Sequence, residues 1–479
     1  MSPSEISRRS MLRGAALGAA ALASGAGKLL AEPVHAPPNI VFILADDMGY
    51  ADIACYGRPD LRTPNIDSIA SRGMRFLQAY ANSAVCSATR TALITGRFQD
   101  RLDVGLDEPL VGPDTGLPPS HPTLPSLVRK AGYGTTLVGK WHLGLPPKYG
   151  PLKSGYDHFL GFRGGAVDYF THSNDLWDED VKVQQVGYLT DLLGNHAVNV
   201  IDDYAKAGKP FLLSLHFNAP HWPWEGPRDE AESRRLIGHR LNDFDGGSQE
   251  TYQRMIEDLD LQVGRVLETL RANGIAENTI VIFTSDNGGE RFADTWPFTG
   301  RKTELLEGGL RIPAVISWPA RIAMGQTTSQ VAISMDWLPT LLAAAGTRPD
   351  FAYPSDGMNL LPFITEGATP VPRKLFGRYK ANAQHAARDG DMKYLKILDN
   401  TFLFNVVEDP MERANLKERQ PDVYSHMVEK WAAWNAVMLP ESDATYTDNF
   451  SGDELADHVG ATKASHKADN PALAVDRRH

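Results

Sequence analysis

The chain has 479 residues and an ordinary globular composition, with 42% hydrophobic and 22% charged residues, 42 Gly and 32 Pro. This composition excludes collagen-like, coiled-coil and disordered classes, and the length allows two or three domains, or one large and one small domain. The formal net charge of −11 argues against a nucleic-acid partner, because phosphate binding needs clustered basic residues. No apolar run reaches the roughly 20 residues that a bilayer crossing requires, so we expect no membrane span and a soluble mature protein.

The first 36 residues are typical of an export leader. Arg8 and Arg9 precede an Ala-, Gly- and Leu-rich stretch that ends near Ala26, where small residues offer cleavage positions. Paired arginines ahead of a weakly apolar segment predict a twin-arginine signal, with the twin-arginine translocase as a partner and the periplasm as the location. The alternative is a basic amphipathic helix or a short membrane-anchoring helix. Twin-arginine substrates cross the membrane folded, so we expect any modification or loading of the site to take place in the cytoplasm.

The next segment alternates between apolar strands and helical patterns. Continuous apolar runs of strand length predict buried strands of a mainly parallel sheet; they cover residues 39–44, 134–139, 211–217, 279–284 and 312–317. The spacing of apolar residues predicts a helix over 251–273, which Gly274 ends. Such alternation is typical of an α/β domain, in which ligands bind beyond the carboxyl ends of the strands.

The pattern changes after residue 370. Short strands are predicted at 375–379, 393–398 and 401–404, with Asp399-Asn400 as the hairpin turn between the last two, followed by an amphipathic helix over 421–438. These elements predict a small α+β subdomain. We therefore expect four parts of the chain, namely a leader (1–36), a catalytic α/β domain (37–370), a C-terminal α+β subdomain (371–440) and a polar tail (441–479).

Polar side chains follow two of the predicted strands. Asp46 and Asp47 end the first strand, and Asp286 and Asn287 end the strand at 279–284. Carboxylate and amide oxygens are hard ligands suited to Ca²⁺ or Mg²⁺. Each pair alone also fits a helix cap or a turn, but their equivalent places at strand ends support a metal site.

Cys86 opens a segment, Cys86-Ser87-Ala88-Thr89-Arg90, whose pattern predicts a short helix that Gly96 ends. The N-terminus of a helix favours an anionic or electron-rich group, and Arg90, one turn further on, can point back toward it. The chain has only two cysteines, so a disulfide with Cys55 or a buried structural thiol are the alternatives.

The segment from Gly132 to His142 contains a near match to a phosphate-binding loop. The Ser or Thr that should follow Lys140 is absent, and the next residues cannot open a helix, so we exclude nucleotide binding. The segment is instead predicted to be a strand. A cation, Lys140, and a titratable group, His142, lie together at its carboxyl end.

Together these segments resemble the type I sulfatases of the alkaline-phosphatase superfamily. The Cys86 segment resembles the C-x-P/A-x-R signature of that family, with Ala88 where many members have proline, and Gly132–His142 resembles its second signature. Three further segments match in the family's order, namely Asn39–Asp47, Asp286–Gly288 and Thr303–Pro313. The resemblance covers about residues 37–420. It implies a large, mainly parallel sheet flanked by helices, a small C-terminal α+β subdomain, and hydrolysis of sulfate monoesters.

The resemblance also implies a modified nucleophile. A formylglycine-generating enzyme would convert Cys86 to Cα-formylglycine (3-oxoalanine), and Arg90 would steady that residue. The hydrated aldehyde has two hydroxyls on one carbon, so that one can attack sulfur while deprotonation of the other expels sulfate. An unmodified Cys or Ser has no second hydroxyl through which sulfate could be expelled. Because the resemblance implies that Cys86 is modified, a disulfide between Cys86 and Cys55 is disfavoured, and Cys55 is expected to be a free thiol.

Further site residues follow from the same resemblance. One divalent ion per chain, usually calcium, would be held by Asp46, Asp47, Cys86, Asp286 and Asn287. Lys140 and Lys302 would hold sulfate oxygens, His142 would be the base that regenerates the aldehyde, and His221 would lie next to the leaving oxygen. Positive groups around the ester would stabilise the charge that develops in the transition state.

Two other functions stay open. A phosphomonoester or phosphonate hydrolase of the same superfamily would use Ser or Thr and more metal ligands, and a non-catalytic, metal-stabilised binding protein would have no need of the site's lysines and histidines. The expected substrate is an aryl or carbohydrate sulfate ester. Aromatic rings stack on both, and the candidates for a pocket wall are Asp168, Tyr169, Phe170, Trp177, His216, Trp222 and Trp224.

Overall fold

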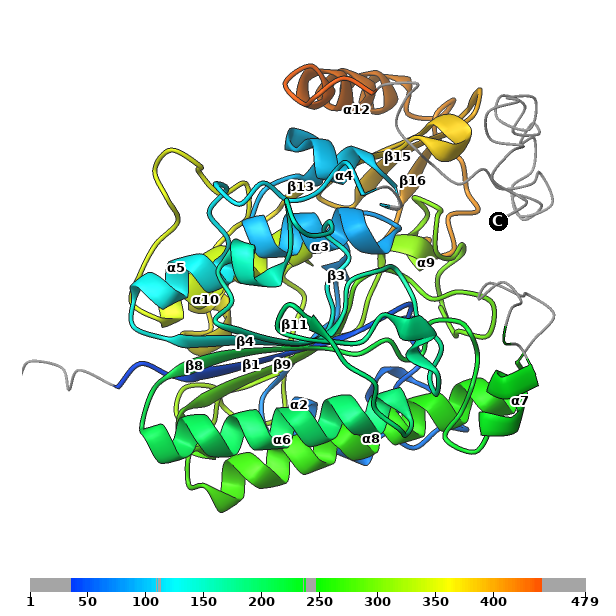
Figure 1. Cartoon of the computed structure of the whole chain (residues 1–479). Helices are drawn as coiled ribbons and strands as arrows, with labels where there is room; N and C mark the ends of the chain where they lie inside the picture. Colours follow the sequence, from blue (N-terminus) through cyan, green and yellow to red (C-terminus); the bar gives the residue numbers. More distant parts are fainter. Residues whose placement is uncertain (1–35, 109, 111–112, 236, 238–246, 442–479) are drawn as a thin grey trace, which may run out of the picture. The chain divides into compact units, whose positions relative to one another are not determined.

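Strand β1 (Asn39–Ala45) is a central strand of a mixed, mostly parallel sheet (Figure 1). Val41 and Ile43 belong to one hydrophobic core, Ile40 and Phe42 belong to another, and all four are buried. A strand covered on both faces needs apolar residues at successive positions. This explains the uninterrupted apolar run in the sequence.

The structure is a computed structural model that describes residues 36–108, 110, 113–235, 237 and 247–441; the predicted leader up to residue 35 and the predicted tail from residue 442 lie outside these residues. Among the described residues the large sheet has ten strands, in the order β11 (Gln326–Thr328), β2 (Met74–Phe76), β10 (Ala314–Ser317), β9 (Thr279–Ser285), β1, β8 (Phe211–His216), β4 (Gly134–Lys140), β5 (His158–Phe162), β6 (Trp177–Asp178) and β7 (Val181–Lys182). Strands β9, β1, β8, β4 and β5 are parallel, whereas β10 runs antiparallel to β9. The predicted strand at 312–317 begins only at Ala314, after Pro313, which has no N–H for a sheet hydrogen bond.

Helices cover both faces of this sheet (Figure 1). One face carries α2 (Pro64–Ser71), α6 (Leu189–Ala207) and α8 (Gln249–Ala272), and the other carries α3 (Cys86–Thr95), α5 (Leu124–Lys130) and α10 (Trp337–Ala344). Shorter elements are α4 (Asp103–Leu106), α7 (Glu230–Arg235), α9 (Glu307–Leu310), α11 (Leu361–Thr365) and the paired strands β3 (Ala79–Tyr80) and β12 (Ala332–Ile333). The predicted helix over 251–273 is confirmed as α8, which starts slightly earlier because the side chain of Ser248 accepts a hydrogen bond from the N–H of Thr251.

The C-terminal region forms a separate antiparallel sheet with a helix packed on it. Its strands are β13 (Lys374–Tyr379), β14 (Gln384–Asp389), β15 (Met392–Ile397) and β16 (Asn400–Asn405), and the helix is α12 (Pro421–Asn435). This confirms the predicted fold class, an α/β sheet with a C-terminal α+β subdomain. The boundary at residue 370 stays a prediction. Strand β14 was not predicted, because its sequence, Gln-His-Ala-Ala-Arg-Asp, lacks the β-branched residues typical of strands.

The predicted turn at Asp399-Asn400 is wrong by one residue. Ile397 pairs with Asn400, so Leu398 and Asp399 make the turn. Leu398 takes a φ of 53° and its side chain is buried in the C-terminal core, while its N–H donates to the carbonyl of Asn382 over 2.7 Å. Burial of the leucyl side chain and this hydrogen bond outweigh the cost of a left-handed backbone.

Candidate active site

Cys86 is the first residue of α3 and lies beside the carboxyl end of β1. Its Sγ is 3.4 Å from Oδ1 of Asp46 and 3.9 Å from Oδ1 of Asp47, and the residue is buried. Burial, reinforced by the negative charge of Asp46, raises the pKa of the Cys86 thiol well above its usual value. Cys55 and Cys86 are both free thiols. The disulfide alternative is therefore wrong, and Cys86 is a protonated thiol that donates to the carboxylates.

The residues predicted to hold a metal come together at one edge of the sheet. Strands β1 and β9 are adjacent and parallel with Ala45 opposite Ser285, so the residues that follow each strand meet. The N–H of Asp47 donates to Oδ1 of Asp286 over 3.2 Å, and Nδ2 of Asn287 donates to Oδ1 of Asp47 over 2.8 Å. Ligand atoms of Asp46, Asp47, Cys86 and His221 all lie within 4.8 Å of one another.

This donor set fits a hard divalent cation. Asp46, Asp47 and Asp286, which we call the carboxylate cluster, are all buried. Burial and the neighbouring charge of Asp286 raise the pKa of Asp46 to about 8, so close packing of carboxylates is costly without added positive charge. Oδ1 of Asn287 is buried and has no hydrogen-bond partner among the described residues. Carboxylates together with an amide oxygen that lacks a partner are the oxygen ligands that Ca²⁺ and Mg²⁺ use.

Each member of the carboxylate cluster is paired with a basic side chain. Nζ of Lys140 is 2.5 Å from Oδ2 of Asp46, and Nζ of Lys302 is 2.6 Å from Oδ2 of Asp47. Nη2 of Arg90 is 2.9 Å from Oδ2 of Asp286. Arg90 lies one helical turn after Cys86, as predicted. Its hydrogen bonds go to Asp286, to the carbonyl of Lys140 and to Nδ1 of His216. These pairs place one basic side chain beside each of the three carboxyl groups.

His142 follows β4, two residues after Lys140, and is buried. Its Nε2 lies 2.8 Å from the carbonyl oxygen of Leu110. A carbonyl can only accept, so Nε2 carries the hydrogen and Nδ1 is the unprotonated nitrogen. That Nδ1 is buried and has no hydrogen-bond partner among the described residues. Burial and the charge of Lys140 lower the pKa of His142 well below its usual value, so the ring is neutral.

His221 has the opposite tautomer. Its Nδ1 donates to the carbonyl of Trp222 over 2.6 Å, which leaves Nε2 to accept from Nζ of Lys302 over 3.2 Å. Burial and the charge of Lys302 lower the pKa of His221. Contacts thus join the predicted site residues into one group, apart from His142, whose ring is hydrogen-bonded to the carbonyl of Leu110. Lys302 and His221 form one hydrogen-bonded pair within this group.

Glu290 belongs to this group and was not predicted. Its Oε2 is 3.8 Å from Nζ of Lys302, and burial raises its pKa to about 7. The available signal was its position four residues after Asp286, in the same loop after β9.

The predicted pocket-wall residues separate into two groups. Tyr169 and Trp224 are buried, and Asp168 accepts hydrogen bonds from the backbone N–H groups of Phe170 and Thr171. Trp222 is half-buried, with its ring centroid 4.3 Å from that of His221 and 5.9 Å from Nζ of Lys302. Two further wall residues also contact the site: Nδ1 of His216 lies 3.5 Å from Nη1 of Arg90, and the hydroxyl of Tyr169 donates to the carbonyl of His221 over 2.9 Å.

Comparison with known proteins identifies the family. The family model described as Sulfatase matches residues 38–347. The chain belongs to the sulfatase family. It is 33% identical to N-acetylgalactosamine-6-sulfatase of Rattus norvegicus over 398 residues, which are 76% of this chain and 72% of the relative. It is 31% identical to arylsulfatase A of Homo sapiens over 384 residues, 71% of this chain and 70% of that one.

A solved structure agrees with the assignment to the sulfatase family. The crystal structure of Ps i-CgsB in complex with k-i-k-neocarrahexaose matches with a TM-score of 0.78 and 30% identity, over 86% of this chain and 96% of that one. The sulfatase is a sulfuric ester hydrolase, as predicted, and family membership implies a bound metal ion, which the buried donor set fits. The phosphoester-hydrolase and binding-protein alternatives are less well supported.

Proposed function

We propose that this sulfatase hydrolyses sulfate esters of carbohydrates or aryl compounds with a formylglycine made from Cys86 and one bound Ca²⁺ or Mg²⁺ ion. The observation that carries the proposal is the position of Cys86 at the start of α3, in contact with two members of the carboxylate cluster. The name of the rat relative and the oligosaccharide in the similar crystal structure favour a carbohydrate sulfate.

The environment of Cys86 argues that the unmodified side chain is not the nucleophile. Its raised pKa keeps the thiol protonated, and the thiolate, not the thiol, is the reactive form. A formylglycine supplies, when hydrated, two hydroxyls on one carbon, of which one attacks sulfur and the other allows sulfate to leave as the aldehyde re-forms. Arg90 supports this residue by holding Asp286, the third member of the carboxylate cluster.

The basic residues provide the electrostatic stabilisation. Asp46, Asp47, Asp286, Asn287 and residue 86 would hold the metal ion, which supplies positive charge at the sulfate oxygens. Because each of the three carboxyl groups already has a basic partner in Lys140, Lys302 or Arg90, a dication makes the group net positive and attractive to a sulfate ester anion. In the transition state, Lys140 and Lys302 share the charge on the sulfate oxygens.

The two histidines have separate roles in proton transfer. His142 is neutral, and its unprotonated Nδ1 has no hydrogen-bond partner within the described part of the chain. It can therefore accept the proton of the second hydroxyl as sulfate leaves. At the leaving-group side, the Lys302 ammonium donates to Nε2 of His221. This pair can deliver a proton to the leaving oxygen.

Peptide mass and substitution at residue 86 test the proposal. The peptide that contains residue 86 should weigh about 18 Da less than its cysteine form and should react with hydrazides. Cys86→Ala should lose aryl sulfatase activity by several orders of magnitude, and Cys86→Ser should be nearly as poor because a sulfated serine has no second hydroxyl. Cys55→Ser is the matched control and should retain activity. An unmodified Cys86 in a fully active enzyme would contradict the proposal.

We also propose that the leader exports the folded enzyme to the periplasm through the twin-arginine translocase, after a formylglycine-generating enzyme has acted on Cys86. The support is the Arg8-Arg9 pair ahead of an apolar segment. Within the part of the chain that the structure describes, no helix has the length and apolar character of a membrane span. Replacing both arginines by lysine should retain the enzyme in the cytoplasm on fractionation, and unchanged export of that variant would point to the general secretory route.

A further inference from the structure

One buried side chain of the C-terminal sheet holds the loop that carries Lys302. Gln384, the first residue of β14, is fully buried. Its Oε1 accepts from the N–H of Leu305 over 2.8 Å, and its Nε2 donates to the carbonyl of Thr303 over 2.8 Å and to that of Ala381 over 3.1 Å. The amide therefore uses both of its donor hydrogens and its acceptor oxygen on backbone groups. It clamps the chain on both sides of residue 304.

The clamped loop leads directly into the site. The N–H of Lys302 donates to the carbonyl of Gly289, in the loop after β9, over 2.9 Å, and the N–H of Thr303 donates to the carbonyl of Ala84, just before Cys86, over 2.8 Å. Thr303 has a φ of 76°. A β-branched residue persists in this left-handed conformation only where its surroundings enforce it. The hydrogen bond from Gln384 to the carbonyl of Thr303 stabilises this conformation.

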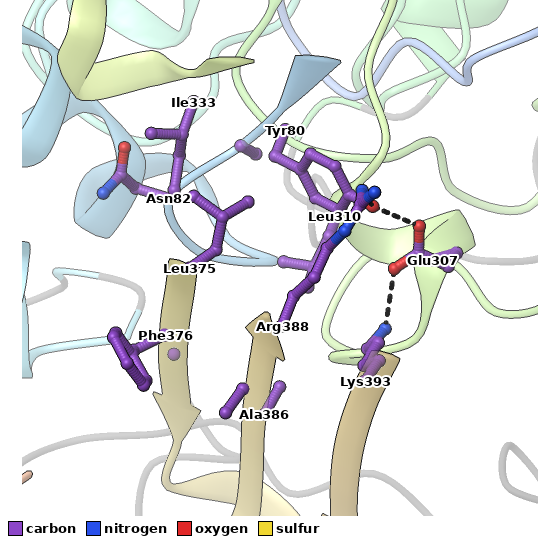
Figure 2. A pocket seen from close by; sticks show the side chains of 13 residues that line it. Tyr80, Asn82, Glu307, Leu310, Ile333, Leu375, Phe376, Ala386, Arg388 and Lys393 are labelled. Atoms are coloured by element: carbon purple, nitrogen blue, oxygen red, sulfur yellow. Dashed lines mark hydrogen bonds and ion pairs between the residues drawn. The ribbon is translucent and has the colours of Figure 1, made fainter. Parts of the chain in front are cut away.

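The far end of the same segment is anchored separately. Figure 2 shows Glu307 between Tyr80 and Lys393, with an oxygen of Glu307 2.5 Å from the Tyr80 hydroxyl and the other 2.9 Å from Nζ of Lys393. Arg311 pairs with the same carboxylate at 3.1 Å. Burial opposes ionisation, but Lys393 and Arg311 outweigh it and lower the pKa of Glu307 to about 2. This ionised anchor fixes the far end of the stretch between Lys302 and Glu307, and Gln384 holds two backbone groups within that stretch.

We infer that Gln384 is a positioning residue for sulfate-ester hydrolysis. By holding Thr303 and Leu305, it sets the backbone origin of Lys302 and hence the point at which Nζ meets Asp47, His221 and the sulfate group. A lysine ammonium sits on a flexible four-carbon stem, so its position depends on a fixed backbone. The inference rests on the role proposed above for Lys302, and it assigns part of the active-site geometry to the C-terminal subdomain.

A double-mutant cycle tests this coupling. Gln384→Met keeps the length and volume of the side chain and removes all three hydrogen bonds. We expect it to lower kcat/KM toward an aryl sulfate roughly ten- to a hundred-fold, measured well below the unfolding temperature. Lys302→Ala should lower kcat/KM more, and Gln384→Met should have no further effect in the Lys302→Ala background. The affinity for inorganic sulfate, measured by calorimetry, should follow the same pattern.

Leu403→Ala is the matched control. Leu403 is buried in the core of the C-terminal sheet on β16, two strands away from β14. Its replacement should lower the melting temperature at least as much as Gln384→Met, because it removes buried apolar volume. It should leave kcat/KM within about twofold, because a leucine side chain makes no hydrogen bond to the loop that Gln384 holds.

Gln384→Glu gives a second test that does not depend on the methionine variant folding. Protonated, the carboxyl accepts from Leu305 and donates to Thr303 as the amide does; ionised, it sets a negative oxygen against the carbonyls of Thr303 and Ala381. The ratio of variant to wild-type kcat/KM should therefore rise as the pH falls. A purely structural role predicts a ratio independent of pH.

The outcomes separate the two proposals. If Lys302→Ala lowers kcat/KM while Gln384→Met does not, or if their effects multiply, the positioning role of Gln384 is overturned. If Lys302→Ala leaves kcat/KM unchanged, the proposed role of Lys302 is wrong, and the inference for Gln384 falls with it.

Discussion

Three carboxylates are buried side by side at the carboxyl edge of the sheet, where isolated charges would be strongly unfavourable. The structure pairs each with a different cation, so that Asp46, Asp47 and Asp286 contact Lys140, Lys302 and Arg90 respectively. These six residues, to which we assign roles in the proposed function, also matter for stability, since removing one partner leaves the other buried without compensation.

Asp286→Ala should abolish turnover and lower the free energy of unfolding, while the protein still folds under native conditions. The substitution removes one proposed metal ligand and leaves the buried guanidinium of Arg90 without its 2.9 Å partner, so both metal retention and the geometry around residue 86 are lost. We expect kcat to fall by several orders of magnitude, with bound metal measured by mass spectrometry and folding by circular dichroism.

The control for this prediction is Asp203→Ala, whose side chain is 82% exposed on α6, and which should keep both metal and activity. Excess chelator should reduce the wild type to the level of Asp286→Ala. Full activity in chelator or in the variant would contradict the metal assignment.

Among the secondary-structure elements, β13 is tied to α12 and to the turn at Gln99–Arg101 by one arginine. Nε of Arg378 is 2.9 Å from Oδ1 of Asp100, and its Nη1 donates to Oδ1 of Asn435 over 2.6 Å. Both charged partners are buried. Burial raises the pKa of Asp100 to about 6 even with Arg378 beside it, so the carboxylate depends on this cation for its charged state.

Arg378→Met should therefore destabilise the protein by about 3–5 kcal/mol, because it leaves Asp100 buried and unpaired. Chemical denaturation at pH 7.5 measures this difference in the free energy of unfolding. Combining Arg378→Met with Asp100→Asn should recover a large part of the loss, since the second change removes the charge. Equal stability of the single and the double variant would show that the ion pair does not account for the effect.

For the molecule as a whole, buried carboxyls couple stability to pH. Burial, aided by the nearby charge of Asp168, raises the pKa of Glu225 from 4.5 to about 9. Between these values the folded protein retains a proton that the unfolded chain releases. The contribution of Glu225 to folding thus becomes less favourable as the pH rises through this window, by at most about 1.4 kcal/mol per pH unit. Below pH 4.5 both states are protonated and the effect vanishes.

Glu225→Gln should remove this dependence. Relative to wild type, the free energy of unfolding of the variant should be similar at pH 5 and higher at pH 8, because glutamine has no proton to lose. Urea denaturation at pH 5, 6.5 and 8 provides the comparison. The exposed Glu268, 68% accessible on α8, offers a control in Glu268→Gln, for which the two pH profiles should coincide. Parallel profiles for wild type and Glu225→Gln would rule out a proton held at this position.

The sequence alone determined the features that depend on local pattern. Apolar runs predicted β1, β4, β8 and β9, and polar residues directly after β1 and β9 predicted the meeting of Asp46, Asp47, Asp286 and Asn287, because parallel strands bring their carboxyl ends to one edge. The helix after Cys86, the family and the reaction class also followed from motifs of neighbouring residues.

Only the tertiary structure decided the features that depend on distant residues. The tautomer of His142 depends on the carbonyl of Leu110, 32 residues away, and the position of the Lys302 loop depends on Gln384, 79 residues from Leu305. Strand β14 and the turn at Leu398 have no local signature, because tertiary packing and burial, rather than intrinsic propensity, stabilise them. Local sequence patterns carry no information about a partner that lies far away in the chain. These contacts form only where the tertiary fold packs the two segments together.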